Sequence, residues 1–100
     1  MKDKLPTITV TENQIKAQIK DFLGYLGIFN FHLLQALGAY KGIPDKIIHY
    51  KGKVIYLEIK RPGGKMSQHQ INFQQQCIED GITYWCVSSS EELGKLLLLS

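Results

Sequence analysis

Residues 42–60 read Gly42-Ile-Pro-Asp-Lys-Ile-Ile-His-Tyr-Lys-Gly-Lys-Val-Ile-Tyr-Leu-Glu-Ile-Lys60. β-Branched and aromatic residues lie on both sides of Lys51 and Gly52, and this pattern predicts a β-hairpin with a two-residue turn. The turn sets a register in which Tyr50 pairs with Lys53, so that the residue numbers of every pair sum to 103. The hairpin is expected to be the centre of the fold.

This register brings charged residues together on one face of the sheet. Asp45 falls opposite Glu58, and Lys60, two residues beyond Glu58, points the same way. Two carboxylates at this distance repel each other and disfavour ionisation unless a cation neutralises them. Mg²⁺ prefers carboxylate and carbonyl oxygens, and proteins usually supply one or two carboxylates beside substrate phosphate oxygens. Asp45, Glu58 and the Ile59 carbonyl therefore predict a metal site for phosphodiester hydrolysis, with Lys60 placed to hold or deprotonate a water.

These motifs resemble those of a known nuclease family. Pro44-Asp45, then twelve residues, then Glu58-Ile-Lys60 resembles the signature of the PD-(D/E)XK nuclease superfamily. Together with Gly42 and the later run Gly-Gly-Lys-x-Ser-x-x-Gln70, it resembles the VRR-NUC (virus-type replication-repair nuclease) domain of stand-alone phage or bacterial type. The resemblance covers about residues 11–97, so residues 1–100 are expected to form one domain with that core.

The resemblance implies a three-layer, restriction-endonuclease-like α/β fold. Its mixed four-stranded sheet is flanked by helices in the order α-β-β-β-α-β-α. It also implies a Mg²⁺- or Mn²⁺-dependent DNA endonuclease, similar to Holliday-junction resolvases, that acts as a homodimer on four-way junctions or other branched DNA. The implied catalytic residues are Asp45, Glu58, Lys60 and Gln70, and the implied metal ligands are Asp45, Glu58, Ile59 and Glu12.

Glu12 has two readings. Thr11-x-x-Gln14 is typical of a capping box, so a helix is expected to start at Glu12 and to stop near residues 24–27. An acidic residue in the first turn complements the helix dipole, a contribution of about 0.3–1 kcal/mol. In the family that the chain resembles, a glutamate on this helix joins the metal site. Both readings stay open.

Gln70 also has two readings, which do not exclude each other. Ser67-x-x-Gln70 predicts a second capping box at the start of a helix that ends at Gly81. The resemblance implies that Gln70 lies beside the metal-bound water and orients it. Gln68 and His69 on the same turn are expected either to touch the backbone of DNA or to be solvated.

Basic residues surround the proposed site. Residues 41–65 contain seven lysines and arginines but only two acids, Asp45 and Glu58. A basic surround with an acidic centre suits a polyanion whose scissile phosphate meets a metal. A lysine-rich hairpin edge kept soluble by its charges is the alternative. The residues expected to contact nucleic acid are Lys41, Lys46, Arg61, Lys65 and Gln68.

The remaining elements are predicted from short patterns. Strands are expected over residues 7–10, 28–34 and 82–87, the last one parallel to the end of the hairpin. The first of these would pair at an edge or in a dimer, and His32 in the second is more often a structural residue than a DNA contact or proton shuttle. A helix capped by Ser89 should bury its leucines, while Leu98 and Leu99 leave apolar surface that suits a dimer.

Composition narrows the class of protein. With 44% hydrophobic and 21% charged residues, the chain is typical of a soluble globular protein. It has neither an apolar run of the ~20 residues that span a bilayer nor an apolar leader, so a cytoplasmic protein of a bacterial or phage-infected cell is expected, without a membrane partner. Cys77 and Cys86 are expected to be free, buried thiols.

Two other functions are compatible with the sequence. A non-catalytic DNA-binding module could keep the nuclease fold, although binding alone does not need the pair of metal ligands. A structural or assembly protein could use the apolar tail, and it would show neither metal dependence nor a salt-sensitive affinity for DNA.

Overall fold

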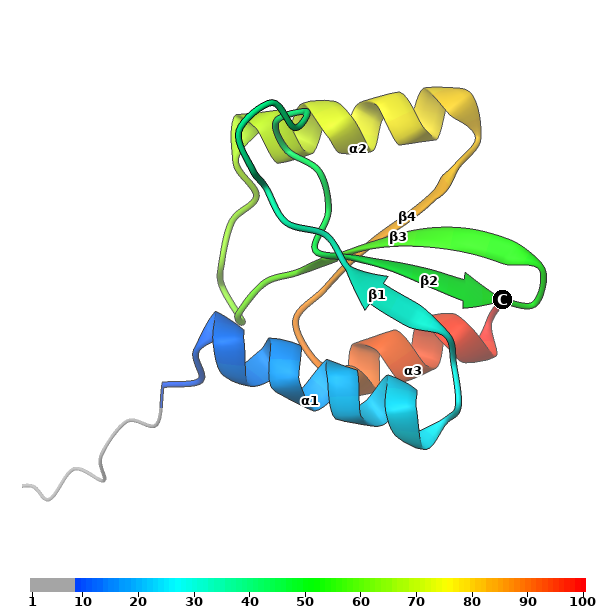
Figure 1. The fold of residues 1–100 in the computed structure, drawn as a ribbon. Coiled ribbons are helices and arrows are strands. Elements are labelled where there is room, and N and C mark those ends of the chain that lie inside the picture. The colour runs from blue at the N-terminus through cyan, green and yellow to red at the C-terminus, as the bar shows by residue number, and fades with distance from the viewer. Residues whose placement is uncertain (1–8) are drawn as a thin grey trace, which may run out of the picture.

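The computed structural model describes residues 9–100, which form a three-layer α/β domain (Figure 1). The sheet order is β1-β2-β3-β4; the first two pairings are antiparallel and the third is parallel. This confirms the predicted order of elements. They are α1 (Glu12–Tyr25), β1 (Asn30–His32), β2 (Lys46–Tyr50), β3 (Lys53–Ile59), α2 (Gln68–Asp80), β4 (Thr83–Val87) and α3 (Ser90–Leu98).

The hairpin has the predicted register. Tyr50 pairs with Lys53, and the ladder continues in the same register to Lys46 opposite Leu57. Lys51 and Gly52 have φ values of 51° and 76°, the left-handed conformations that a two-residue turn of this kind needs. The turn therefore fixes which residues lie opposite each other at the far end of the hairpin.

Each of the two long helices begins at a capping box, as predicted. The Thr11 hydroxyl accepts a hydrogen bond from the Gln14 amide, and the Gln14 side chain accepts one from the Thr11 amide. Ser67 and Gln70 make the same pair of bonds at the start of α2. These bonds satisfy amides that have no partner within the helix, so they fix where the first turns of α1 and α2 lie.

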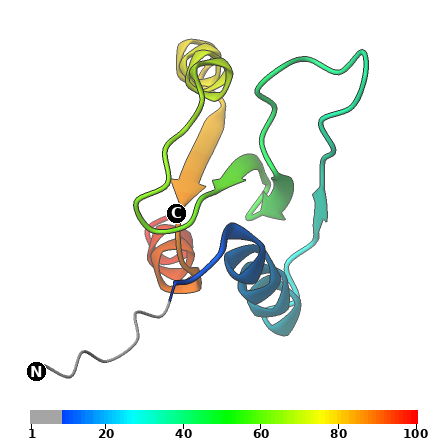
Figure 2. The ribbon, with the colours of Figure 1, turned by 90° about the vertical axis from the view of Figure 1, so that its left-hand side faces the viewer.

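The main core lies on one face of the sheet. Figures 1 and 2 show α1 and α3 on this face and α2 on the other. Fully buried aliphatic side chains of this kind contribute about 1.5–3 kcal/mol each. On the second face, Phe73 of α2 packs against Tyr40, Tyr56 and Tyr84. The core residues include Ile19, Leu23, Ile48, Ile55, Leu57, Val87 and Leu93.

Several boundaries differ from the predictions. The first strand covers only Asn30–His32. The Leu33 amide makes one further bond in the same register, to the Asp45 carbonyl, and the chain then leaves the sheet as a loop. The strand expected over residues 7–10 falls partly outside the described residues, and its described part, Thr9 and Val10, is not a strand.

The two faces of the sheet are covered unequally, because α1 and α3 share one face and α2 alone covers the other. Val54, near the turn end of β3, is 51% exposed. Cys77 is buried and Cys86 half-buried, and both thiols are free, as predicted. Within residues 9–100, no helix has the length and apolar character needed to cross a bilayer.

Candidate active site

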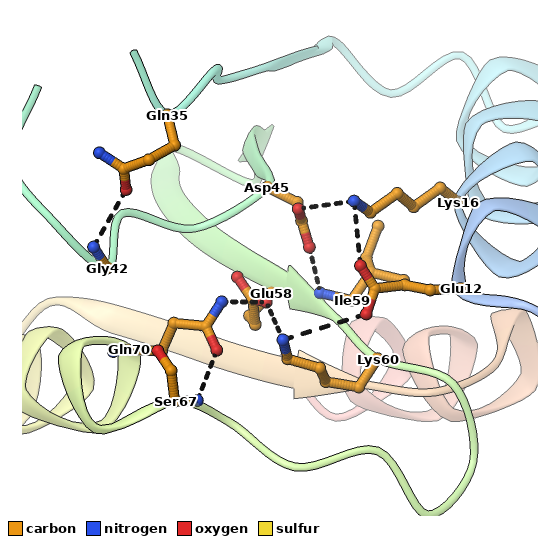
Figure 3. Close-up of polar contacts among 10 residues, drawn as sticks. All are labelled: Glu12, Lys16, Gln35, Gly42, Asp45, Glu58, Ile59, Lys60, Ser67 and Gln70. Atoms are coloured by element: carbon orange, nitrogen blue, oxygen red, sulfur yellow. Dashed lines mark hydrogen bonds and ion pairs between the residues drawn. The ribbon is translucent and has the colours of Figure 1, made fainter. Parts of the chain in front are cut away.

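Four elements bring polar side chains together at one end of the hairpin (Figure 3). Asp45 directly precedes β2, while Glu58 and Lys60 lie at the end of β3 and just beyond it. Glu12 comes from the first turn of α1 and Gln70 from the first turn of α2. All four predicted catalytic residues therefore lie in one cluster, together with Glu12.

Asp45 is held by backbone on both sides. The Ile59 amide donates a hydrogen bond of 2.7 Å to Asp45 Oδ2, and the Leu33 amide donates one of 2.7 Å to the Asp45 carbonyl. The first bond crosses the hairpin one residue beyond Glu58, so the register itself orients the carboxylate. Asp45 Oδ1 is left to face α1.

Glu58 is an almost fully buried acid with an incomplete set of partners. Its Oε2 accepts a hydrogen bond of 2.9 Å from Gln70 Nε2 and lies 3.2 Å from Lys60 Nζ. Its Oε1 is buried without a hydrogen-bond partner among residues 9–100. Burial first, and the charge of Asp45 second, raise the pKa of Glu58 to about 7, although Lys60 opposes the shift. A cation at Oε1 would remove this cost.

Two lysines neutralise the carboxylates. Lys60 Nζ lies 3.2 Å from Glu58 Oε2 and 4.0 Å from Glu12 Oε1. Lys16 Nζ bridges Glu12 Oε2 at 3.2 Å and Asp45 Oδ1 at 3.1 Å. Burial works against the charge of Lys16, but Asp45 and Glu12 together raise its pKa above the ordinary value.

The sequence reasoning missed Lys16. Its spacing of four residues from Glu12 on a predicted helix was the available signal, because such pairs share one helix face. Its contact with Asp45 depends on how α1 docks against the sheet, which no local pattern reports.

The donor set fits a hard divalent cation at the pair Asp45 and Glu58. Glu58 has one buried carboxylate oxygen without a partner and feels the charge of Asp45, and one or two protein carboxylates are what Mg²⁺ usually takes. Within the described part of the chain, no three His, Cys, Asp or Glu side chains gather closely enough to hold a metal. Lys16 and Lys60 lie between Glu12 and the pair, so the role of Glu12 as a ligand stays a prediction.

A groove of about 520 Å³ adjoins Asp45 on the side of α2. One wall is the loop over residues 33–42, which Gln35 closes: its side chain donates to the Tyr40 carbonyl at 3.0 Å and accepts from the Gly42 amide at 3.1 Å. Gly42 has a φ of 87°, and a Cβ there would collide with the backbone carbonyl of His69. The loop thus rests directly on the first turn of α2.

The residues expected to contact nucleic acid occupy different environments. Arg61, Lys65 and Gln68 are exposed on the connection from β3 and the start of α2, and Lys41 is exposed at the groove. Lys46 is only 8% exposed, because its side chain lies against α1. Burial, followed by the charge of Lys20, lowers its pKa.

Two of the three histidines, His32 and His69, also lie beside the site. His69 lines the groove, and exposed His32 lines a second pocket on the other side of Asp45. Neither side chain makes a hydrogen bond with any other residue of 9–100.

Solved structures share this fold. A structure titled "VRR_NUC domain" superposes with a TM-score of 0.73 at 23% identity, covering 88% of this chain and 96% of its own. A second, titled "VRR_NUC domain protein", gives a TM-score of 0.71 at 14% identity, covering 91% of this chain and 88% of its own. No protein-family model and no curated protein matches the sequence. The chain has the fold of a VRR-NUC domain.

Proposed function

We propose that the protein is a Mg²⁺- or Mn²⁺-dependent endonuclease that hydrolyses phosphodiester bonds in DNA. The fold, shared with two VRR_NUC structures, supports a nuclease-type domain. One observation carries the step to metal-dependent hydrolysis: buried Glu58 keeps one oxygen without a partner, while Lys60 and Gln70 contact its other oxygen and the charge of Asp45 acts on it. The large majority of buried side-chain oxygens in proteins have a hydrogen-bond partner, so a carboxylate with a purely structural role is expected to have both oxygens paired.

The proposed metal ligands are Asp45, Glu58 and the Ile59 carbonyl, with Glu12 as a further ligand. The bound cation would neutralise charge on the phosphate and lower the pKa of a water. The hydrogen bond from the Ile59 amide already orients the Asp45 carboxylate. The residues of this chain therefore hold the ligand oxygens in place before any substrate binds.

Lys60 and Gln70 are proposed to act on the attacking water. Both contact Glu58 Oε2, Lys60 Nζ at 3.2 Å and Gln70 Nε2 at 2.9 Å. Gln70 also keeps the cap of α2 through its Oε1, so its amide is held in a fixed orientation. The two donors therefore flank one carboxylate oxygen and are placed to orient a water beside it.

Branched DNA, four-way junctions above all, is the proposed substrate. The described 92 residues form the core and three helices only, and no element is left over to read base edges, so contacts would be mainly with phosphates. Arg61, Lys65 and Lys41 are exposed beside the site for this purpose. A homodimer would offer two such sites to the two strands of a junction.

Cleavage of end-labelled DNA tests this proposal. A four-way junction and a linear duplex made from the same strands are incubated with Mg²⁺, with Mn²⁺ and with EDTA. The proposal predicts metal-dependent cutting of the junction and much slower cutting of the duplex. Equal cutting of both would contradict the substrate class, and binding without cutting under every condition would favour a non-catalytic DNA-binding module.

A further inference from the structure

A second pocket adjoins the proposed active site on the other side of Asp45. It has a volume of about 320 Å³ and lies between α1 and the β1–β2 edge of the sheet. Lys20 of α1, His32 of β1 and Lys46 of β2 line it. Asp45 lines both this pocket and the groove beside α2, so the two cavities meet at the proposed metal ligand.

The pocket holds more positive than negative charge, because three lysines and one carboxylate, Asp45, line it. Lys46 is 8% exposed, yet its ammonium forms no ion pair with any carboxylate of residues 9–100, and neither does that of Lys20. Asp45, the acid of this pocket, is already bonded to the Ile59 amide and Lys16. Burying an ammonium without a partner is costly. A bound anion would offset that cost.

The side chains match a phosphate group. Two ammonium groups supply up to six N–H donors, and the imidazole of His32 supplies another. Hydrogen bonds from charged donors to phosphate oxygens are about twice as strong as those between neutral groups. The pocket is open to solvent and its donors come from three elements, α1, β1 and β2, so an anion there would also tie α1 to the sheet edge.

We propose that Lys20, His32 and Lys46 form a phosphate subsite beside the carboxylate cluster. The subsite would take the phosphate that flanks the scissile one, so that the strand passes over Asp45 from the α2 groove to the α1 pocket. This inference rests on the proposed nuclease function for its ligand. The same chemistry would also hold a terminal phosphate of a cut strand or free phosphate.

Binding in EDTA tests the subsite without cleavage. The affinity for a fluorescent four-way junction is measured by anisotropy over a range of salt concentrations. Each lost phosphate contact lowers the magnitude of the log K against log salt slope by about 0.9. Lys20→Met should show this loss, and Lys46→Met should show the same loss if circular dichroism confirms that it folds. Lys53→Met, at the turn end of the hairpin, makes the same change in charge and should keep the wild-type slope.

A titration with inorganic phosphate, followed by ¹H–¹⁵N spectra, distinguishes a phosphate of the DNA backbone from a terminal or free phosphate. Shifts at Lys20, His32 and Lys46 together with the slope change assign the subsite to a backbone phosphate. Shifts with equal slopes assign it to a terminal or free phosphate. Equal slopes without shifts, or shifts unchanged in Lys20→Met, would overturn the proposal. Because no metal is present, these results hold whether or not the protein cuts DNA, so the two proposals fail separately.

Discussion

At the scale of single residues, Glu58 is a buried carboxylate at the position of a proposed metal ligand. Burial, followed by the charge of Asp45, raises its pKa to about 7, so the folded protein binds this proton more tightly than the unfolded chain does. The sign of the effect follows directly: the folded state loses stability as the pH rises from about 4.5, the ordinary pKa, to about 7. The folded protein is therefore least stable at the pH values at which the Glu58 carboxylate is ionised, and the ionised form is the one that would bind a cation.

Glu58→Gln should therefore stabilise the protein at pH 8 and abolish cleavage. One pKa unit is equivalent to about 1.4 kcal/mol, so the expected gain in the free energy of unfolding is about 1–3 kcal/mol at pH 8, shrinking toward pH 4. Urea unfolding at both pH values measures it. Glu79→Gln, on the exposed side of α2, is the control and should show no such pH dependence. A loss of stability at pH 8 would contradict the role given to burial.

Lys16 should compete with the metal. Its ammonium bridges Glu12 and Asp45, and each half-exposed ion pair contributes about 0.2–1 kcal/mol. Lys16→Met removes both pairs and should tighten Mn²⁺ binding about three- to tenfold, as measured by isothermal titration calorimetry. Lys20→Met, one turn along α1, should bind Mn²⁺ like the wild type. Weaker binding by Lys16→Met would show that Lys16 supports the site.

At the scale of elements, the site depends on how two connections pack. The loop over residues 33–42 meets the first turn of α2 at Gly42, where only a residue without a Cβ fits against the His69 carbonyl. Gln70, one residue further on, carries the amide that bonds Glu58. A displacement at Gly42 would therefore reach the carboxylate cluster through α2.

Gly42→Ala and Gly38→Ala form a matched pair for this contact. Both glycines have similar φ values, 87° and 86°, but a Cβ at Gly38 meets nothing within 4 Å. Gly38→Ala should cost about 1 kcal/mol of stability from backbone strain alone. Gly42→Ala should cost about 1–3 kcal/mol more from overpacking and should also lower the cleavage rate. Equal losses of stability in thermal unfolding would mean that the contact with α2 does not contribute to the effect.

The sequence predicted the parts of the site that local patterns determine. The hairpin turn and both capping boxes depend on residues at most a few positions apart, and they placed Asp45, Glu58 and Gln70 correctly. The bridge by Lys16 and the burial of Lys46 depend on where α1 docks against the sheet. The length of β1 was also missed, because the ladder ends one bond beyond His32, where the chain leaves the sheet for the loop over residues 33–42.

At the scale of the whole molecule, the apolar surface far from the site supports a proposed dimer. Leu98 and Leu99 are 84% and 85% exposed, and Leu98 borders a pocket of about 550 Å³ between α1 and α3, with Phe22 and Leu26. Exposed apolar surface of this kind favours association. A dimer through this face would leave both carboxylate clusters open to DNA.

Sedimentation velocity at micromolar concentration tests this interface. The wild type should sediment as a dimer and Leu98→Glu as a monomer, because a charge there would be buried without a partner. Leu37→Glu is the control, since Leu37 is fully exposed on the loop at the other end of the molecule. A wild type that sediments as a monomer, or a dimer that survives Leu98→Glu, would place the interface elsewhere or remove it.

The cluster around Glu58 is proposed to cut DNA with a metal ion. The most direct measurement is the single-turnover cleavage rate of a labelled four-way junction in Mg²⁺ and in EDTA for wild type, Lys60→Met and Lys53→Met. We predict cutting by wild type and Lys53→Met in Mg²⁺ only, and a loss of about 10²-fold or more in Lys60→Met. Wild-type rates in Lys60→Met, or cutting that persists in EDTA, would contradict the claim.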